Sequence, residues 1–379
     1  MTDPRIGRRA LLLAALGSVT AACTRAGGDD VPAVMEPLPA APAETSGTVA
    51  IKPVAHWTAV FQQSWNYLLD DGARMSRSAD SWDHYNVSYS VDAFTAMFRA
   101  TGEHRYLDEA FTFAENVVDS AVPSTSLPGS TFHDSYRGWA SQQNGEQGDE
   151  IPLFESYFWR YGTALLTAVR ERPEIYADKN YRMRYERLLA FAETNVFAKW
   201  WDRGAHEYIY RERTHMAAHW ALISLNLSRV TGDPGRRQRY LDVAATIDAR
   251  LRHQMRRNPM EPTAYFWSDV WGSAKRPGQD VSHGNGVMAY VAEARDHGTA
   301  WTAADTTAFS SLLTKVIWPA ATTYREYVDG TGADNGWWSD GFVKLGRYHT
   351  AVQARLEGHR VVNEQFAANM ALNARLLRP

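Results

Sequence analysis

The segment AFTAMFRATGEHRYLDEAFTFAENV, residues 93–117, recurs later in the chain in a longer form. It aligns with ALISLNLSRVTGDPGRRQRYLDVAATIDARL, residues 221–251, so that TGE and RYLDEA match TGD and RYLDVA. Residues 164–193 form a weaker third copy. In each copy, apolar residues recur every three or four positions on both sides of a short turn, which predicts a pair of amphipathic helices. A spacing of about 60 to 65 residues between copies indicates a protein built from repeated helical hairpins.

The same helical spacing continues from His56 to the end of the chain, and no sustained alternation typical of strands competes with it. It predicts helices at 56–70, 87–101, 104–119, 153–171, 180–199, 214–231, 237–256, 284–297, 303–326, 348–357 and 361–377. We therefore expect an all-α fold, an (α/α) toroid of inner and outer helices. Six or seven helical hairpins would form it as an incomplete barrel.

Five longer loops precede the first helix of a hairpin, and they contain Gly, Trp, His, Asp and Asn. They are residues 72–85, 121–151, 200–213, 257–282 and 328–347. In a toroid these loops lie on one face, above the starts of the inner helices. Long loops of this kind carry function more often than short turns do, so we expect the functional site on this face.

Composition narrows the class of protein. The chain has 379 residues, with 40 Lys and Arg against 43 Asp and Glu, so its net charge is −3. This near-balance argues against a nucleic-acid partner, which normally meets a basic surface. Aromatic residues make up 12% of the chain, including 14 Trp. Such rings pack in cores, but they also stack on sugar rings.

The first 23 residues have the features of a signal peptide. Arg8 and Arg9 precede the apolar run ALLLAALGSVTAA, which is too short for a stable membrane span. Cys23, the only cysteine, follows this run as in a lipoprotein cleavage box, which predicts lipidation of Cys23. We expect an exported protein, either a cell-surface or periplasmic lipoprotein or a secreted one, that meets a membrane only through this anchor.

Residues 24–54 are rich in Ala, Pro and Gly and predict a flexible linker to a catalytic domain at 55–379. With Cys23 used for lipidation, no cysteine remains for disulfides, thiolate catalysis or Cys-based zinc sites.

Polar residues that could catalyse a reaction or bind a substrate gather at the starts of the predicted inner helices. They are Asn86, Glu155, Tyr157, Arg211, Arg213, His215, His219, His283, Asn285 and Tyr290. His215 and His219 are four residues apart and share a helical face. His283 and Tyr290 are seven apart and also share one. The H-E-x-x-H pattern of metalloproteases is absent, so we expect no metal site and no cofactor, with a structural Ca²⁺ left open.

Several loops place Trp beside Asp or Asn, a composition typical of sugar-binding clefts. The tryptophans concerned are Trp201, Trp271, Trp337 and Trp338. The alternative is that these rings are buried and anchor the loops.

Paired helices, an export signal, aromatic loops and the His, Asn, Tyr and Arg set together resemble the (α/α)-barrel polysaccharide lyases of the alginate and glucuronan lyase type. The resemblance implies β-elimination at a uronate, where one group neutralises the carboxylate and others move the proton. It implies neutralising roles for Asn86, His215 and Arg211, with His283 and Tyr290 as the candidates for base and acid in either order. We expect substrate binding by His219, Glu155, Tyr157, Asn285, Arg213, Lys344 and the four loop tryptophans.

Two other readings stay open. An (α/α)-barrel glycoside hydrolase needs two carboxylates, and candidates are Asp70, Asp71, Asp149, Glu150, Glu155, Asp269, Asp280, Asp334 and Asp340. A non-catalytic glycan-binding lipoprotein needs the aromatic rings but not the His and Tyr set. In each case we expect a monomer with a polysaccharide or oligosaccharide partner.

Overall fold

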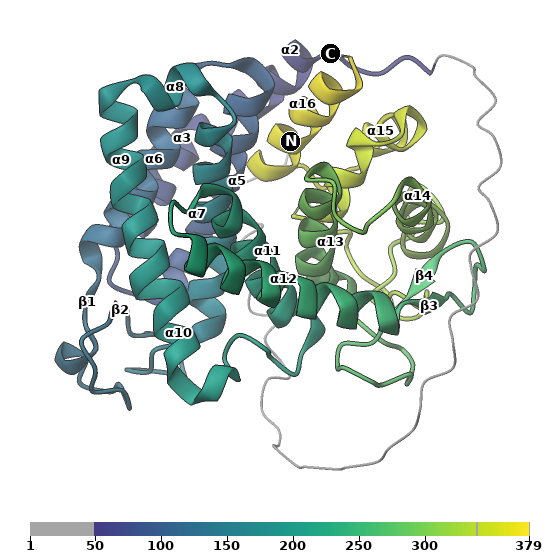
Figure 1. Ribbon diagram of the computed structural model, residues 1–379. Coiled ribbons are helices and arrows are strands. Elements are labelled where there is room, and N and C mark those ends of the chain that lie inside the picture. Colours follow the sequence, from purple (N-terminus) through teal and green to yellow (C-terminus); the bar gives the residue numbers. More distant parts are fainter. Residues whose placement is uncertain (1–48, 339, 379) are drawn as a thin grey trace. The chain divides into compact units, whose positions relative to one another are not determined.

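A computed structural model describes residues 49–338 and 340–378 (Figure 1). The predicted signal peptide, the lipidation site Cys23 and residues 24–48 of the predicted linker lie outside the described residues. The described chain is mainly helical, which confirms the all-α class. In the described ranges, no helix is long and apolar enough to cross a membrane.

The three sequence repeats are helical hairpins. The first consists of α5 (Ser81–Thr101) and α6 (His104–Ser120), and the last of α11 (Thr214–Val230) and α12 (Pro234–Gln254). The weaker copy contains α7 (Pro152–Arg170), the short α8 (Pro173–Ala177) and α9 (Lys179–Phe191). Gly102 turns the chain between α5 and α6 with a φ of 75°, in the left-handed region that glycine adopts without strain.

The other elements complete the helical chain. Its α-helices are α2 (Val54–Gln62), α3 (Trp65–Tyr67), α4 (Ala73–Ser76), α10 (Lys199–Asp202), α13 (Val281–Asp296), α14 (Ala303–Ser311), α15 (Thr350–Leu356) and α16 (Glu364–Leu377). The π-helical segments are η2 (Leu68–Gly72), η4 (Ala192–Ala198) and η6 (Leu312–Ile317). The 3₁₀-helical segments are η3 (Ser124–Ser126), η5 (Arg203–His206) and η7 (Phe342–Arg347). Two small antiparallel pairs join β1 (Val122–Pro123) to β2 (Arg137–Gly138) and β3 (Arg256–Arg257) to β4 (Tyr265–Phe266).

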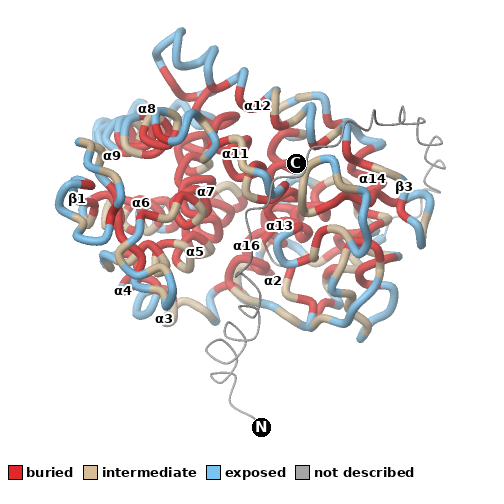
Figure 2. Tube along the Cα trace, turned by 90° about the horizontal axis from the view of Figure 1, so that it is seen from below, coloured by how far each residue is buried: buried red, intermediate tan, exposed pale blue. Residues whose placement is uncertain are grey.

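The long helices that follow the loops pack against one another in series. Helix α5 contacts α16 and α7, and α11 contacts α7 and α13, while η7 contacts both α13 and α16. These helices are buried along most of their length, whereas α12 buries one face and exposes the other (Figure 2). Because α6 and α12 pack on α5 and α11, the second helix of each of these hairpins covers the first.

Three predicted segments differ from the structure. The helix predicted at 303–326 ends at Ile317, because Pro319 disfavours helical backbone at the residue before it. The helix predicted at 56–70 is divided between α2, α3 and η2. The predicted loop 72–85 contains α4 and the first turn of α5.

Much of the tryptophan excess is core packing. The nearly fully buried rings are Trp139, Trp159, Trp200, Trp220, Trp267, Trp301 and Trp338. Four of them, Trp139, Trp200, Trp267 and Trp338, come from segments predicted as loops, and their burial agrees with the alternative that such rings anchor the loops.

Candidate functional site

Three histidines singled out in the sequence lie together where α11 and α13 begin. The ring centres of His215 and His283 are 4.4 Å apart, and those of His215 and His219 are 6.2 Å apart. His215 and His219 both belong to α11, and they share a helical face because they are four positions apart. Helix α13, which packs on α11, supplies His283, so two separate helices contribute to one cluster, which we call the histidine site.

His283 forms a dyad with Asp280, the residue that caps α13. The Asp280 carboxylate accepts a hydrogen bond from the backbone N–H of His283 at 2.9 Å, and each of its oxygens lies 2.9 Å from His283 Nδ1. This contact orients the ring so that Nε2 points away from Asp280. Burial lowers the pKa of His283, but the hydrogen bond and negative charge of Asp280 outweigh burial and raise it above 6.5. The side chain is 47% exposed, so it is an oriented and accessible acid–base group.

The other two histidines are buried and neutral. Burial lowers the pKa of His215, and the neighbouring His283 lowers it further. Burial also lowers the pKa of His219, helped by the charge of Arg160. Neither ring nitrogen of His215 has a hydrogen-bond partner among the described residues, and neither does Nε2 of His219. Buried polar atoms without partners are rare in proteins, which indicates that these atoms meet water or a ligand.

A buried ion pair adjoins this cluster. Arg160 Nη2 lies 2.6 Å from Asp340 Oδ2, and the Tyr157 hydroxyl donates to the same oxygen at 3.0 Å. The guanidinium lies 3.8 Å from the centre of the Tyr157 ring, whose own centre is 5.0 Å from that of His219. Arg160 Nη1 has no hydrogen-bond partner among the described residues, although the side chain is fully buried.

Gly286 of α13 has a packing role. A Cβ atom on Gly286 would lie 2.7 Å from His219 Nε2, so only glycine permits this approach of α13 to α11. On Gly284 a Cβ atom would meet Trp267 at 3.4 Å, an ordinary van der Waals distance, so packing alone does not require glycine there.

Aromatic rings of α5 continue outward from Tyr157. The Tyr85 ring stacks on that of Tyr157 at 3.7 Å, and Trp82 stacks on Tyr85 at 4.8 Å. The Tyr89 hydroxyl lies 2.8 Å from that of Tyr157. Trp82, Tyr85 and Tyr89 are all half-buried. The row therefore links the protein surface to the histidine site.

Asn285 holds a loop rather than facing the cluster. Its side-chain oxygen accepts the backbone N–H groups of Gly341 at 3.0 Å and Phe342 at 3.2 Å. Because Asp340 directly precedes these residues, Asn285 fixes the carboxylate that binds Arg160. The structure therefore gives Asn285 a positioning role, and its substrate-binding role stays a prediction.

Asn285→Ala is expected to lower the free energy of unfolding by about 1–3 kcal/mol, because it leaves two buried N–H groups without an acceptor. Urea unfolding measures this change. The exposed Gln238→Ala on α12 is the control and should shift stability by less than about 0.5 kcal/mol. Equal effects of the two changes would contradict the role given to Asn285.

Four other predicted site residues do not join the histidine site. The Tyr290 hydroxyl donates to Asp248 of α12 at 2.8 Å, so Tyr290 shares no contact with His283. Asn86 donates to the carbonyl of Trp82 at 2.8 Å within α5. The remaining two are buried in ion pairs: Glu155 with Lys199 at 2.6 Å, and Lys344 with Asp92 at 3.0 Å. The helical repeat places residues on a face but does not say which neighbour that face meets.

Of the two arginines before α11, one lies near the cluster. Arg213 pairs with Asp269 on the surface, and its charge lowers the pKa of both His215 and His283. Arg211 contacts Met216 instead, and burial lowers its pKa.

The loop tryptophans are largely committed to protein contacts. Trp201 stacks on His206 at 3.8 Å, and Trp271 donates to the carbonyl of Arg211 at 2.6 Å. Trp338 is fully buried and stacks on His359 at 4.5 Å. Trp337 is half-buried beside Asn285. The ring that adjoins the histidine site is Tyr157 of α7, and Tyr85 and Trp82 of α5 extend outward from it.

Sequence reasoning missed Arg160 and gave Asp340 only as a hydrolase carboxylate. Arg160 follows Tyr157 by three positions and stands between apolar and aromatic residues in the middle of α7, and a charge in that setting was the available signal.

Within the described ranges, no group of three His, Cys, Asp or Glu residues is arranged to hold a metal ion. Comparison of the chain with protein-family models, curated proteins and solved structures finds no match.

Proposed function

We propose that the described helices form an (α/α) toroid. The series α16, α5, α7, α11 and α13 supplies its inner helices, and η7 occupies the position between α13 and α16. Helices α6 and α12 belong to its outer layer. In this arrangement the starts of α5, α7, α11 and α13 surround one mouth.

We propose that the protein is an exported polysaccharide lyase that cleaves uronate-containing glycans of the glucuronan or alginate kind by β-elimination. The observation that carries this proposal is the accessible Asp280–His283 dyad beside a neutral, unpartnered His215. The export signal and the lipid anchor at Cys23 belong to the same proposal.

In the proposed reaction, His283 Nε2 removes the proton from the carbon next to the uronate carboxylate. His215, beside His283, donates a hydrogen bond to that carboxylate, and the nearby positive charge of Arg160 stabilises the negative charge that develops. The carbon–oxygen bond to the leaving sugar breaks as the double bond forms. The protonated His283 then returns its proton to the leaving oxygen. The aromatic row of α5 holds the glycan.

The test is to mix the full chain with glucuronan and alginate and follow the ultraviolet absorbance of the conjugated double bond. A rise supports the lyase. Release of reducing ends without that absorbance would establish hydrolysis instead, and binding without product would establish a non-catalytic glycan-binding protein.

A glycoside hydrolase is the second candidate because two nearby carboxyl groups have pKa values shifted in opposite directions. Burial raises the pKa of Asp334, and the charges of Glu326 and Asp280 raise it further. Burial alone would raise the pKa of Asp280, but the hydrogen bond and charge of His283 outweigh burial and lower it. One protonated and one ionised carboxyl group would suit the acid and base of hydrolysis.

The rate of the lyase reaction should rise with pH along an acidic limb. Because the base acts only when deprotonated, kcat/KM increases as His283 loses its proton, with a midpoint above 6.5. Asp280→Asn keeps a helix cap but removes the charge that raises this pKa, so the midpoint should move to lower pH. Profiles of kcat/KM against pH for both proteins measure this, and an unmoved limb would exclude His283 as the titrating base.

A further inference from the structure

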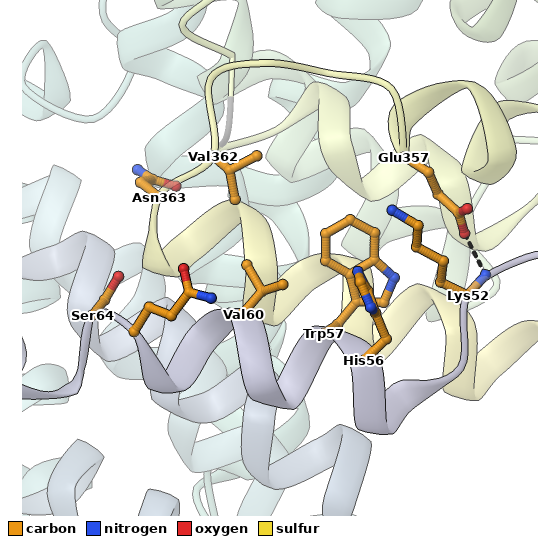
Figure 3. Close-up of a pocket in the computed structure, with 9 residues that line it drawn as sticks. Lys52, His56, Trp57, Val60, Ser64, Glu357, Val362 and Asn363 are labelled. Carbon is orange, nitrogen blue, oxygen red and sulfur yellow. Dashed lines mark hydrogen bonds between the residues drawn. The ribbon is translucent and has the colours of Figure 1, made fainter. Parts of the chain in front are cut away.

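A groove of about 250 Å³ lies between α2 and the segment that joins α15 to α16 (Figure 3). Residues of α2 form one wall, and residues 357–363 form the other. None of the lining residues belongs to the histidine site or to the aromatic row of α5. The groove is therefore separate from the proposed catalytic residues.

The floor of the groove contains an unsatisfied donor. Trp57 is only 3% exposed, and its indole N–H has no acceptor among the described residues. The half-buried Lys52 ammonium lies 5.4 Å from the centre of the Trp57 ring. Buried donors in proteins normally have a partner, so the indole N–H points to an acceptor supplied by a ligand.

The remaining wall residues combine donors and acceptors. One carboxylate oxygen of Glu357 accepts a hydrogen bond from the backbone N–H of Lys52 at 2.5 Å, and the second oxygen takes no part in that bond. The Asn363 side-chain oxygen caps α16 by accepting the N–H of Phe366 at 2.8 Å, so its amide NH₂ is left to donate. Gln63 and Ser64 add an amide and a hydroxyl. Such a mixture, with one carboxylate and one ammonium, suits several hydroxyl groups better than a single anion.

Two valines, Val60 and Val362, line the groove between these polar groups. They offer apolar surface to the C–H groups of a ring. Sites for drug-sized ligands occupy about 300–1,000 Å³, so a groove below that range fits a single ring.

We propose that this groove binds one sugar residue of a glycan, as a second binding site separate from the histidine site. Which polymer carries this sugar rests on the proposed function. Recognition of a sugar ring through contacts with its hydroxyl groups does not depend on that function. A glycan bound in this groove through one sugar would stay attached to the protein while other sugars of the same glycan reach the histidine site.

The experiment follows the indole N–H resonances of the full chain by NMR during titration with D-glucose. The Trp57 resonance is assigned by its loss in Trp57→Phe, and that of Trp65 by its loss in Trp65→Phe. We expect a saturable shift of the Trp57 resonance, with a dissociation constant on the order of millimolar, and no shift of the Trp65 resonance. Lys52→Met should weaken binding about fivefold, as should Trp57→Phe measured by saturation transfer to the sugar.

Binding is measured without turnover, so failure of the lyase assay leaves this test intact. The shift should persist in His283→Ala, because the histidine site shares no residue with the groove. No shift with glucose, an equal shift with acetate, or loss of the shift in His283→Ala would each overturn the proposal.

Discussion

His283→Ala is expected to lower kcat/KM for a polyuronate by about 10²- to 10⁴-fold, the usual contribution of a positioned general base. The ring is half-exposed, and the backbone N–H that Asp280 caps remains in the variant. The fold should therefore persist while the proton acceptor is lost. Initial rates from the double-bond absorbance measure the loss, and urea unfolding checks the fold.

The matched control is His253→Ala, because His253 is an exposed histidine near the end of α12. It should leave kcat/KM unchanged. A His283→Ala enzyme within tenfold of the unmodified protein would mean that another group removes the proton, and the dyad would then be structural.

The hairpins could be predicted because their determinants are local. TGE at 101–103 and TGD at 231–233 each stand between two amphipathic runs, and helices end and begin there as expected. The error at 318–326 was avoidable, since Pro319 was a visible stop signal. The irregular start of the domain was harder to predict, because η2 follows α3 without any break in the apolar spacing.

The histidine site could be predicted only in part. His215 and His219 share a face by spacing alone, and the repeats suggested that His283 would join them. The Arg160–Asp340 pair joins residues 180 positions apart, and nothing near either residue indicates the other. The position of Tyr290 could not be predicted for a related reason, because the residue that accepts its hydroxyl is Asp248 on another helix.

Asp340→Ala is expected to lower the free energy of unfolding by about 3–5 kcal/mol, because it leaves the buried Arg160 charge without its partner. Both side chains are almost inaccessible, at 0% for Arg160 and 6% for Asp340. The change also removes the acceptor of the Tyr157 hydroxyl and a contact of the Gln365 amide at 3.4 Å. Urea unfolding at neutral pH measures the difference.

The control is Asp119→Ala, which removes an Arg–Asp pair of the same chemistry from the surface. Asp119 pairs with Arg187, and both side chains are about half-exposed, at 61% and 47%. Because water solvates both charges there, the expected cost is below about 1 kcal/mol. If Asp340→Ala costs no more than this control, Arg160 does not depend on Asp340, and the guanidinium must be held by its contacts with Tyr157 and Tyr161, whose ring centres lie 3.8 and 4.5 Å away. A large difference would instead mean that the loop fixed by Asn285 supplies the charge that keeps Arg160 in place beside the histidines.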